Sequence, residues 1–240
     1  MSLPETKKVI QTLAKYSVCD LSDALVKTGL KKGGYFPNLV RQSQNPTGAT
    51  MVGKAYTVLF APKDDPRPAI KGGYIDKVTE DSVLVIALSK NLQKLDAPYT
   101  KISNALYGGL MSTRANYLKS NGTIVFGRVR DIDEHKELKR DVFSYGLGST
   151  AHGPVLKLVG INVPVEVLID DYPEPRTEVI NPGDYIMGDD NGVVKVEDNA
   201  DLLSILEYIP KRVAADTLVK EDILKGEECT PSQKKRRAGL

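Results

Sequence analysis

Uninterrupted apolar runs along this chain predict buried strands. Ser82–Leu88 consists almost wholly of apolar residues, which is typical of a strand that is covered on both faces. Met51–Phe60 is a second predicted strand, and Thr123–Phe126 is a third, bounded by glycines on either side. Shorter strands are expected near 142–143, 155–158 and 163–168, and turns at 181–184 and 189–192 set off two more. Together these segments predict a mixed sheet.

Helical spacing of apolar residues predicts helices near both ends of the chain. Two short helices are expected at Glu5–Lys15 and Leu21–Lys27. Asp20 or Ser22 is the expected cap of the second helix. Leu202–Leu224 is a longer helix that Pro210 breaks or kinks, because proline lacks the N–H that the helix needs. Helices and strands alternate without repeats or linkers, so we predict one α/β domain over residues 1–240.

Two adjacent glycines, Gly108 and Gly109, interrupt the helical spacing of residues 100–119. Inside one helix they would cost about 2 kcal/mol relative to alanines. We therefore expect a break, with a new helix beginning near Gly109. The N–H groups at a helix N-terminus are unpaired and carry partial positive charge, so this point favours a bound anion. The alternative interpretation is that the glycines only allow two elements to pack closely.

A second polar segment follows the strand at Thr123–Phe126. Arg130 and Asp131 stand where that strand ends and a helix at Ile132–Leu138 is expected to begin, which is the usual place for ligand sites in α/β sheets. Asp131 with Glu134 also fits a capping box. A cap does not account for Arg130, whose planar guanidinium suits two-point binding of a carboxylate. A cap alone and a ligand site both remain open.

Composition excludes several functions. With 33 basic and 31 acidic residues, the chain has no field that would attract nucleic acid. The two cysteines lack the number for a disulfide framework and the spacing for a metal site. No apolar run approaches the roughly 20 residues of a bilayer span, and the polar N-terminus lacks a secretory signal. We expect a cytoplasmic protein with no nucleic-acid or membrane partner. The polar tail at 227–240, which ends in four basic residues, is expected to be disordered.

Some weaker motifs do not indicate function. Gly146–Ala151 fits the dinucleotide-binding glycine pattern, but Pro154 follows too soon for a long helix. With only two histidines, a histidine-rich zinc site is excluded. His135 is expected on the exposed face of a helix. His152 lies in a loop that could be near a site, although a solvated or hydrogen-bonded histidine is the simpler expectation.

The glycine and arginine–aspartate segments, taken together, resemble the RraA-like family. The resemblance is carried by Tyr107–Ala115, Gly127–Glu134, Pro182–Asp184 and Gly188–Val194. It runs in order from about Val9 to Leu218, and Gly33–Pro37 and Asp64–Pro68 further resemble the fungal members. The family includes the regulators of RNase E activity and the metal-dependent 4-hydroxy-4-methyl-2-oxoglutarate aldolases.

The resemblance implies a β/β/α swivelling-domain fold that assembles as a homotrimer or a dimer of trimers. It also implies that the backbone of Gly108, Gly109, Leu110 and Met111 binds the carboxylate of a small 2-oxo acid, that Arg130 binds substrate oxygens, and that Asp131 holds Mg²⁺ or Mn²⁺. Many bacterial aldolases carry an aspartate where this chain has Gly109, whereas other members have glycine there and an acid at the position of Glu134. Glu134 is therefore the expected group for acid–base work. The identity of the base is open, because Asp133 or a carboxylate of a neighbouring subunit, from Glu207, Asp216 or Glu221, could serve instead.

These residues predict a divalent-metal-dependent lyase. Cleavage of a C–C bond in a 2-oxo acid leaves a pyruvate enolate, whose charge a metal ion and Arg130 would stabilise. The same site would serve 4-hydroxy-4-methyl-2-oxoglutarate aldolase and oxaloacetate decarboxylase activities. The alternative, from a different class, is a non-catalytic protein that regulates an RNA-processing assembly through protein contacts.

Overall fold

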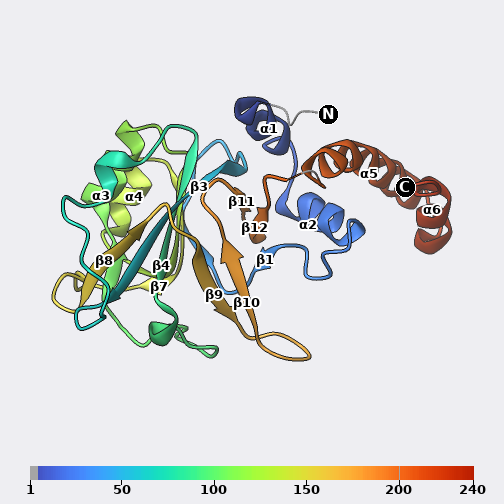
Figure 1. The fold of residues 1–240 in the computed structure, drawn as a ribbon. Coiled ribbons are helices and arrows are strands. Elements are labelled where there is room, and N and C mark those ends of the chain that lie inside the picture. The colour runs from blue at the N-terminus through green and yellow to red at the C-terminus, as the bar shows by residue number, and fades with distance from the viewer. Residues whose placement is uncertain (1–4, 200) are drawn as a thin grey trace.

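A ten-stranded mixed sheet forms the centre of the molecule, with a two-stranded hairpin on one face and helices on the other (Figure 1). The computed structural model describes residues 5–199 and 201–240. The helices are α1 (Thr6–Leu13), α2 (Val18–Lys27), α3 (Gly109–Tyr117), α4 (Ile132–Glu137), α5 (Asp201–Leu224) and α6 (Cys229–Arg236), with single 3-10 turns η1 (Ile75–Lys77) and η2 (Lys90–Leu92). The strands are β1 (Tyr35–Phe36), β2 (Val40–Ser43), β3 (Met51–Pro62), β4 (Ser82–Leu88), β5 (Ala105–Tyr107), β6 (Gly122–Val129), β7 (Asp141–Leu147), β8 (Leu156–Ile161), β9 (Val165–Ile169), β10 (Arg176–Ile180), β11 (Tyr185–Asp189) and β12 (Gly192–Val196).

The central strands run parallel to one another. In the order β1-β12-β11-β3-β4-β6-β7-β2, the neighbours from β3 to β7 are parallel and the other pairs are antiparallel. β5 pairs with the last residues of β6 in parallel, and β8 pairs with the second half of β3. The carboxyl ends of β5, β6 and β7 therefore lie at one edge of the sheet.

Alternate residues of the central strands face two different apolar layers. In β4, Val83, Val85 and Ala87 face the β9–β10 hairpin, whereas Leu84, Ile86 and Leu88 belong to the cluster beside α3 and η1. Because both faces are covered, the strand is apolar throughout, as the sequence predicts. The arrangement is thus a hairpin layer, a sheet layer and a helix layer, which agrees with the β/β/α expectation.

The helices α1, α2 and α5 pack together on the β11–β12 end of the sheet (Figure 1). The cap of α2 is Ser17, whose hydroxyl accepts the N–H of Asp20, while the Asp20 carboxylate accepts the N–H of Ser17. The expectation of a cap at Asp20 or Ser22 was therefore wrong. The helix begins one turn earlier than predicted because Val18 and Leu21 are both buried against the sheet and extend its apolar stripe.

The long helix α5 runs through Pro210, so of the two outcomes predicted there, a break or a kink, the break does not occur. Proline removes one backbone hydrogen bond, but Ile205, Ile209 and Ala215 remain buried on either side of it. Packing of this face keeps the two halves in one helix. α5 and α6 extend away from the sheet (Figure 1).

The C-terminal segment forms helix α6, so the expectation of a disordered tail was wrong. Its anchor is Asp222 near the end of α5, which is buried and accepts hydrogen bonds from Ser232 Oγ at 2.6 Å and from Arg236 Nε and Nη2 at 2.8 Å each. These partners hold the pKa of Asp222 well below its usual range. Composition shows only a polar tail here, because it cannot show which arginine meets a buried carboxylate.

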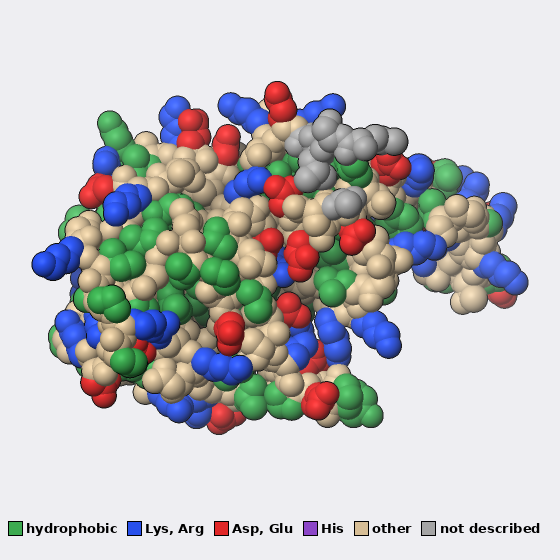
Figure 2. All heavy atoms as spheres, in the orientation of Figure 1, with side chains coloured by type: hydrophobic (Ala, Val, Ile, Leu, Met, Phe, Trp, Pro, Cys, Tyr) green, Lys and Arg blue, Asp and Glu red, His purple; other side chains and the backbone are tan. Residues whose placement is uncertain are grey.

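The surface shows no preference for one sign of charge on the face drawn in Figure 2, where basic and acidic side chains are interspersed. Both cysteines, Cys19 and Cys229, are exposed free thiols. In the part of the chain that the structure describes, no helix is both long enough and apolar enough to cross a bilayer.

Candidate active site

The glycine segment and the arginine–aspartate segment meet at the end of two parallel strands. Ala105 pairs with Arg128, and Tyr107 with Val129, so β5 and β6 end side by side. The N–H of Arg130 then donates to the carbonyl of Tyr107 at 3.0 Å. The chain therefore leaves both strands at the same edge of the sheet, and the two segments face one another across it.

A new helix begins at the glycine pair, as predicted, but the segment before it is the strand β5 and not a helix. Gly108 is extended, with φ −149° and ψ −177°, and α3 begins at Gly109. A Cβ on Gly108 would lie 2.6 Å from Asp131 Oδ2, and a Cβ on Gly109 would lie 1.8 Å from Glu134 Oε2. The glycines thus do permit a close approach, and what approaches them is the pair of carboxylates of the second segment.

Asp131 has the left-handed backbone conformation, with φ 59° and ψ 47°, which aspartate tolerates better than most residues. Its Oδ2 accepts the N–H of Gly109 at 3.1 Å and lies 3.4 Å from Arg130 Nε. The side chain makes no capping hydrogen bond to α4, so the capping-box interpretation was wrong. Because the known contacts engage Oδ2, the second oxygen, Oδ1, is the one that can reach a ligand.

A cleft of about 440 Å³ lies over these groups. It is lined by Ala105, Leu106, Tyr107, Gly108, Leu110, Met111, Arg130, Asp131, Glu134, Ala151 and His152. Every residue predicted for the site lines this cleft except Gly109, which is buried beneath Glu134. A second space of about 360 Å³ adjoins the Arg130–Asp131 pair and is lined further by Ile132, Leu147, Gly148 and Ser149. The pair thus stands between two compartments.

Helix geometry leaves N–H donors at the floor of the cleft. The first N–H groups of α3 have no intrahelical acceptor, and Asp131 takes only that of Gly109. The N–H groups of Leu110 and Met111 therefore remain for an anion, together with the positive end of the helix dipole. Arg130 adds a full positive charge, and its side chain is 41% exposed, so the guanidinium can contact a ligand from solvent.

His152 lies in a loop, as predicted. It is hydrogen-bonded through Nδ1 to the carbonyl of Ala105, and it also lines this cleft. Two hydrogen bonds hold its loop at the start of β5: Ala105 N donates to Thr150 O at 2.8 Å, and Nδ2 of Asn104, the residue before the strand, donates to Ala151 O at 2.9 Å. Burial lowers the pKa of the imidazole, and the charges of Arg130 and Lys63 lower it further. The place of His152 near the site could have been predicted, because β7 runs parallel to β6 and the loop after β7 therefore starts at the same edge of the sheet as Arg130.

His135 is fully buried, so its expected place on an exposed helix face was wrong. Its ring stacks on Tyr107 with centroids 5.5 Å apart and an angle of 5° between the planes. Burial lowers its pKa, and the nearby charge of Arg140 acts in the same direction. The helix α4 has only six residues, which is too short for apolar spacing to show which side faces the protein.

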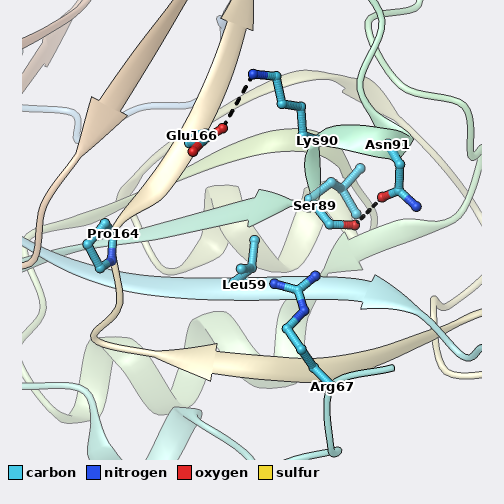
Figure 3. A pocket seen from close by; sticks show the side chains of 8 residues that line it. Leu59, Arg67, Ser89, Lys90, Asn91, Pro164 and Glu166 are labelled. Atoms are coloured by element: carbon cyan, nitrogen blue, oxygen red, sulfur yellow. Dashed lines mark hydrogen bonds and ion pairs between the residues drawn. The ribbon is translucent and has the colours of Figure 1, made fainter. Parts of the chain in front are cut away.

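A further cleft, of about 400 Å³, lies between β3, the loop after β4 and β9 (Figure 3). Its cations are paired with acids: Lys90 Nζ lies 3.6 Å from Glu166 Oε2, and Arg67 Nε donates to Asp65 Oδ1 at 2.8 Å. Ser89 Oγ donates to Asn91 Oδ1 at 2.7 Å. Since these polar groups satisfy one another, the cleft beside Arg130 is the stronger candidate for chemistry.

The described residues contain no group of three or more His, Cys, Asp or Glu side chains that could enclose a metal ion. A divalent ion at this site would therefore depend on Asp131 with water and substrate oxygens. Mg²⁺ accepts such a set, since it commonly keeps several waters and uses one or two carboxylates. The free oxygen of Asp131 and the hard-oxygen chemistry of the cleft fit Mg²⁺ or Mn²⁺.

Comparison with known proteins decides the family. The family model described as RraA-like, Aldolase/RraA, matches residues 18–195, which include both segments of the cleft. The chain belongs to the RraA-like family. This RraA-like protein is 26% identical over 217 residues to Protein DlpA of Legionella pneumophila, a match that covers 90% of this chain. It spans only 31% of the length of DlpA.

Solved structures share the fold of this RraA-like protein. An uncharacterized protein from Pseudomonas syringae pv. tomato superposes with a TM-score of 0.73 at 22% identity, covering 97% of this chain and 100% of that one. RraAS2 of Streptomyces coelicolor, described as an unusual member of the RNase ES inhibitor RraA protein family, gives 0.66 at 18% identity, with 95% and 100% covered. At these identities the likeness concerns the fold alone. The family thus includes aldolases as well as inhibitors of RNA-processing enzymes.

Proposed function

We propose that this RraA-like protein is a divalent-metal-dependent lyase that cleaves 2-oxo acids and releases pyruvate. The observation that carries the proposal is the meeting, in one cleft, of the α3 N-terminus, the Arg130 guanidinium and a carboxylate with an oxygen free for a ligand. A protein that acted only by binding another protein would not need these three groups in one concave site. The proposed activities are 4-hydroxy-4-methyl-2-oxoglutarate aldolase and oxaloacetate decarboxylase.

The α3 N-terminus is the proposed binding site for the substrate carboxylate. The N–H groups of Leu110 and Met111 would donate to it, and the helix dipole would favour its charge. Arg130, one residue before the metal-binding position, would donate to the 2-oxo oxygen, on which negative charge develops as the C–C bond breaks. Because that charge is greater in the transition state than in the substrate, Arg130 would contribute to rate as well as to binding.

Asp131 is the proposed ligand of Mg²⁺ or Mn²⁺. A bound divalent ion would act as an electron sink that stabilises the pyruvate enolate. The hydrogen bond from Gly109 to Oδ2 fixes the orientation of the Asp131 carboxylate before any ligand binds. The left-handed backbone at Asp131 turns the chain back toward α3, and thereby brings the carboxylate to the floor of the cleft.

Glu134 is the proposed residue for orienting water and moving protons. Its carboxylate lies in the space that a side chain on Gly109 would occupy, directly beside the N-terminus of α3. The acid of this site therefore comes from α4, and the glycine at position 109 leaves the room for it. This geometry supports the link between Gly109 and Glu134 that the family resemblance implies.

Pyruvate release tests the proposal. Purified protein would be assayed with oxaloacetate and with 4-hydroxy-4-methyl-2-oxoglutarate, in Mg²⁺ or Mn²⁺ and then in EDTA, with the rate from metal ion alone subtracted. We expect release that depends on both protein and metal ion. Arg130→Ala and Asp131→Asn should abolish it, and Asn is the suitable replacement because it tolerates the left-handed backbone.

Absence of protein-dependent release from both compounds would refute the lyase. The non-catalytic regulator would then be the better account, and binding to an RNA-processing ribonuclease would be the next measurement. Assembly as a homotrimer or a dimer of trimers remains a proposal, to be tested by light scattering of the eluting protein. A special relation to the fungal members also remains a proposal.

A further inference from the structure

We propose that His152 is the base that removes the C4 hydroxyl proton when the substrate is a 4-hydroxy-2-oxo acid. The inference rests on the proposed function and adds a residue that its residue assignments do not include. His152 lines the same cleft as Arg130, Asp131 and Glu134, although it comes from a different loop. It is the only imidazole among the residues that line this cleft.

The hydrogen bonding of the ring selects one tautomer. His152 Nδ1 lies 3.3 Å from the carbonyl oxygen of Ala105. A carbonyl oxygen can only accept, so Nδ1 must carry the proton of the neutral ring, and Nε2 is left as the acceptor. The ring is also held edge-on against Phe60, with centroids 4.5 Å apart. Both contacts hold the imidazole in place and leave Nε2 as the nitrogen that can act as a base.

The surrounding charges keep the ring neutral near pH 7. Burial lowers the pKa of His152, and Arg130 and Lys63 lower it further through their positive charges. Asp131 and Glu134 are the acidic groups that share the cleft. Asp131 lies with Arg130 in the turn between β6 and α4, and Glu134 lies on α4. A neutral imidazole with a free nitrogen can accept a proton, whereas an imidazolium cannot.

The proposed step is balanced within the site. Nε2 takes the C4 hydroxyl proton, the O–H electron pair forms the C4 carbonyl, and the C3–C4 bond breaks. Its electron pair becomes the enolate of pyruvate. The imidazolium then gives the proton to C3, so 4-hydroxy-4-methyl-2-oxoglutarate yields two pyruvates and His152 is neutral again. Decarboxylation of oxaloacetate removes no proton from the substrate, and its enolate can take a proton from water.

The two reactions therefore distinguish the role of His152. The variant His152→Asn keeps a side-chain N–H that can donate to Ala105 O but has no basic nitrogen. We expect cleavage of 4-hydroxy-4-methyl-2-oxoglutarate to fall about 10²- to 10⁴-fold in kcat, the usual contribution of a general base. Oxaloacetate decarboxylation by the same variant should stay within about threefold of the wild type, because its barrier includes no such proton transfer.

Equal losses with both substrates would overturn the inference, because they would show that His152 only supports the structure. Unchanged cleavage of both substrates would overturn it as well. If the wild-type protein releases no pyruvate from either compound, the proposed function itself is wrong, and this result is distinguished from a failure of the His152 inference because it needs no variant.

NMR gives a readout that does not depend on turnover. The chain has two histidines, so comparison with the spectrum of His152→Asn assigns both ring signals. We expect pyruvate to shift the His152 signal and to leave that of buried His135 in place. Absence of any shift at saturating pyruvate would contradict the placement of His152 in the substrate site.

Discussion

The space beside Gly109 allows a test of Glu134 that leaves Glu134 itself unchanged. In Gly109→Ala, the new Cβ would meet Oε2 of Glu134 at 1.8 Å and its Cδ at 2.3 Å. Ordinary van der Waals contact requires that the carboxylate move away by roughly 1.5–2 Å. The backbone itself should tolerate alanine, because the left-handed conformation is not found at Gly109. The change therefore displaces the Glu134 carboxylate, and the contact with Glu134 Cβ at 2.9 Å also requires a shift of a few tenths of an ångström where α4 faces α3.

The expected effects on stability are small and opposite in sign. A strained Glu134 side chain costs about 0.5–1.5 kcal/mol. Replacement of glycine by alanine in a helix contributes up to about 1 kcal/mol in favour of the folded state. The free energy of unfolding should thus change by less than about 1 kcal/mol, and Tm by at most about 4 °C for a domain of this size. Pyruvate release from 4-hydroxy-4-methyl-2-oxoglutarate should fall about 10²-fold or more, because a displaced carboxylate no longer assists proton transfer.

The measurement is a double-mutant cycle on kcat with Gly109→Ala, Glu134→Ala and the double variant. If alanine at position 109 acts only through Glu134, the double variant should match Glu134→Ala. Thermal unfolding of all four proteins controls for loss of fold. Wild-type turnover in Gly109→Ala would refute the role given to Glu134. A double variant whose loss in kcat equals the product of the two single-variant losses would refute it as well.

Three further predictions concern stability. The pKa of His135 is lowered in the folded protein, so the unfolded chain takes up the proton at higher pH than the folded protein does. The free energy of unfolding, measured by urea titration, should therefore decrease as pH falls below about 6.5. His135→Phe should weaken that dependence on pH. Asp222→Asn should loosen α6 from α5, because it weakens the hydrogen bonds from Arg236. Trypsin should then cut at residues 234–237 faster than in the wild type. Asp201→Asn, near the start of α5, is the control and should not change the cutting rate. Phe126→Ala should lower the free energy of unfolding by about 3–5 kcal/mol, measured by urea denaturation, because the Phe126 ring is buried in the layer between the sheet and the β9–β10 hairpin, against Phe36. A loss below about 1 kcal/mol would contradict that packing.

Much of the central sheet could be predicted because its strands are buried on both faces. β4 is apolar from Val83 to Leu88, and β6 has the apolar run Ile124–Phe126 at its centre, which is typical of strands covered on both faces. The short strands were missed because they contain too few residues to show a pattern. β1 has two residues and β5 has three, so they are defined by their hydrogen-bonded partners, β12 and β6, which lie far away in sequence.

Those parts of the site that local sequence rules determine could be predicted. Those parts that depend on tertiary contacts could not. The break at Gly109 and the position of Arg130 at the end of a strand follow from local rules. The turn of Asp131 toward Gly109 does not, because the aspartate could equally have capped α4. His135 shows the same limit, since only the contact with Tyr107 reveals that it faces inward.

The pairing of β3 has a consequence for how the chain folds. Its first half pairs with β11 and its second half with β8, so one edge of β3 stays open until residues 156–188 have been synthesised. Pairings so distant in sequence are slow to form, because a long loop must close before they are stabilised. During synthesis, β3 therefore presents twelve residues of unpaired strand edge, the kind of surface on which chains associate. Refolding yield should accordingly fall with protein concentration, and β8 and β11 act as the segments that end this period of exposure.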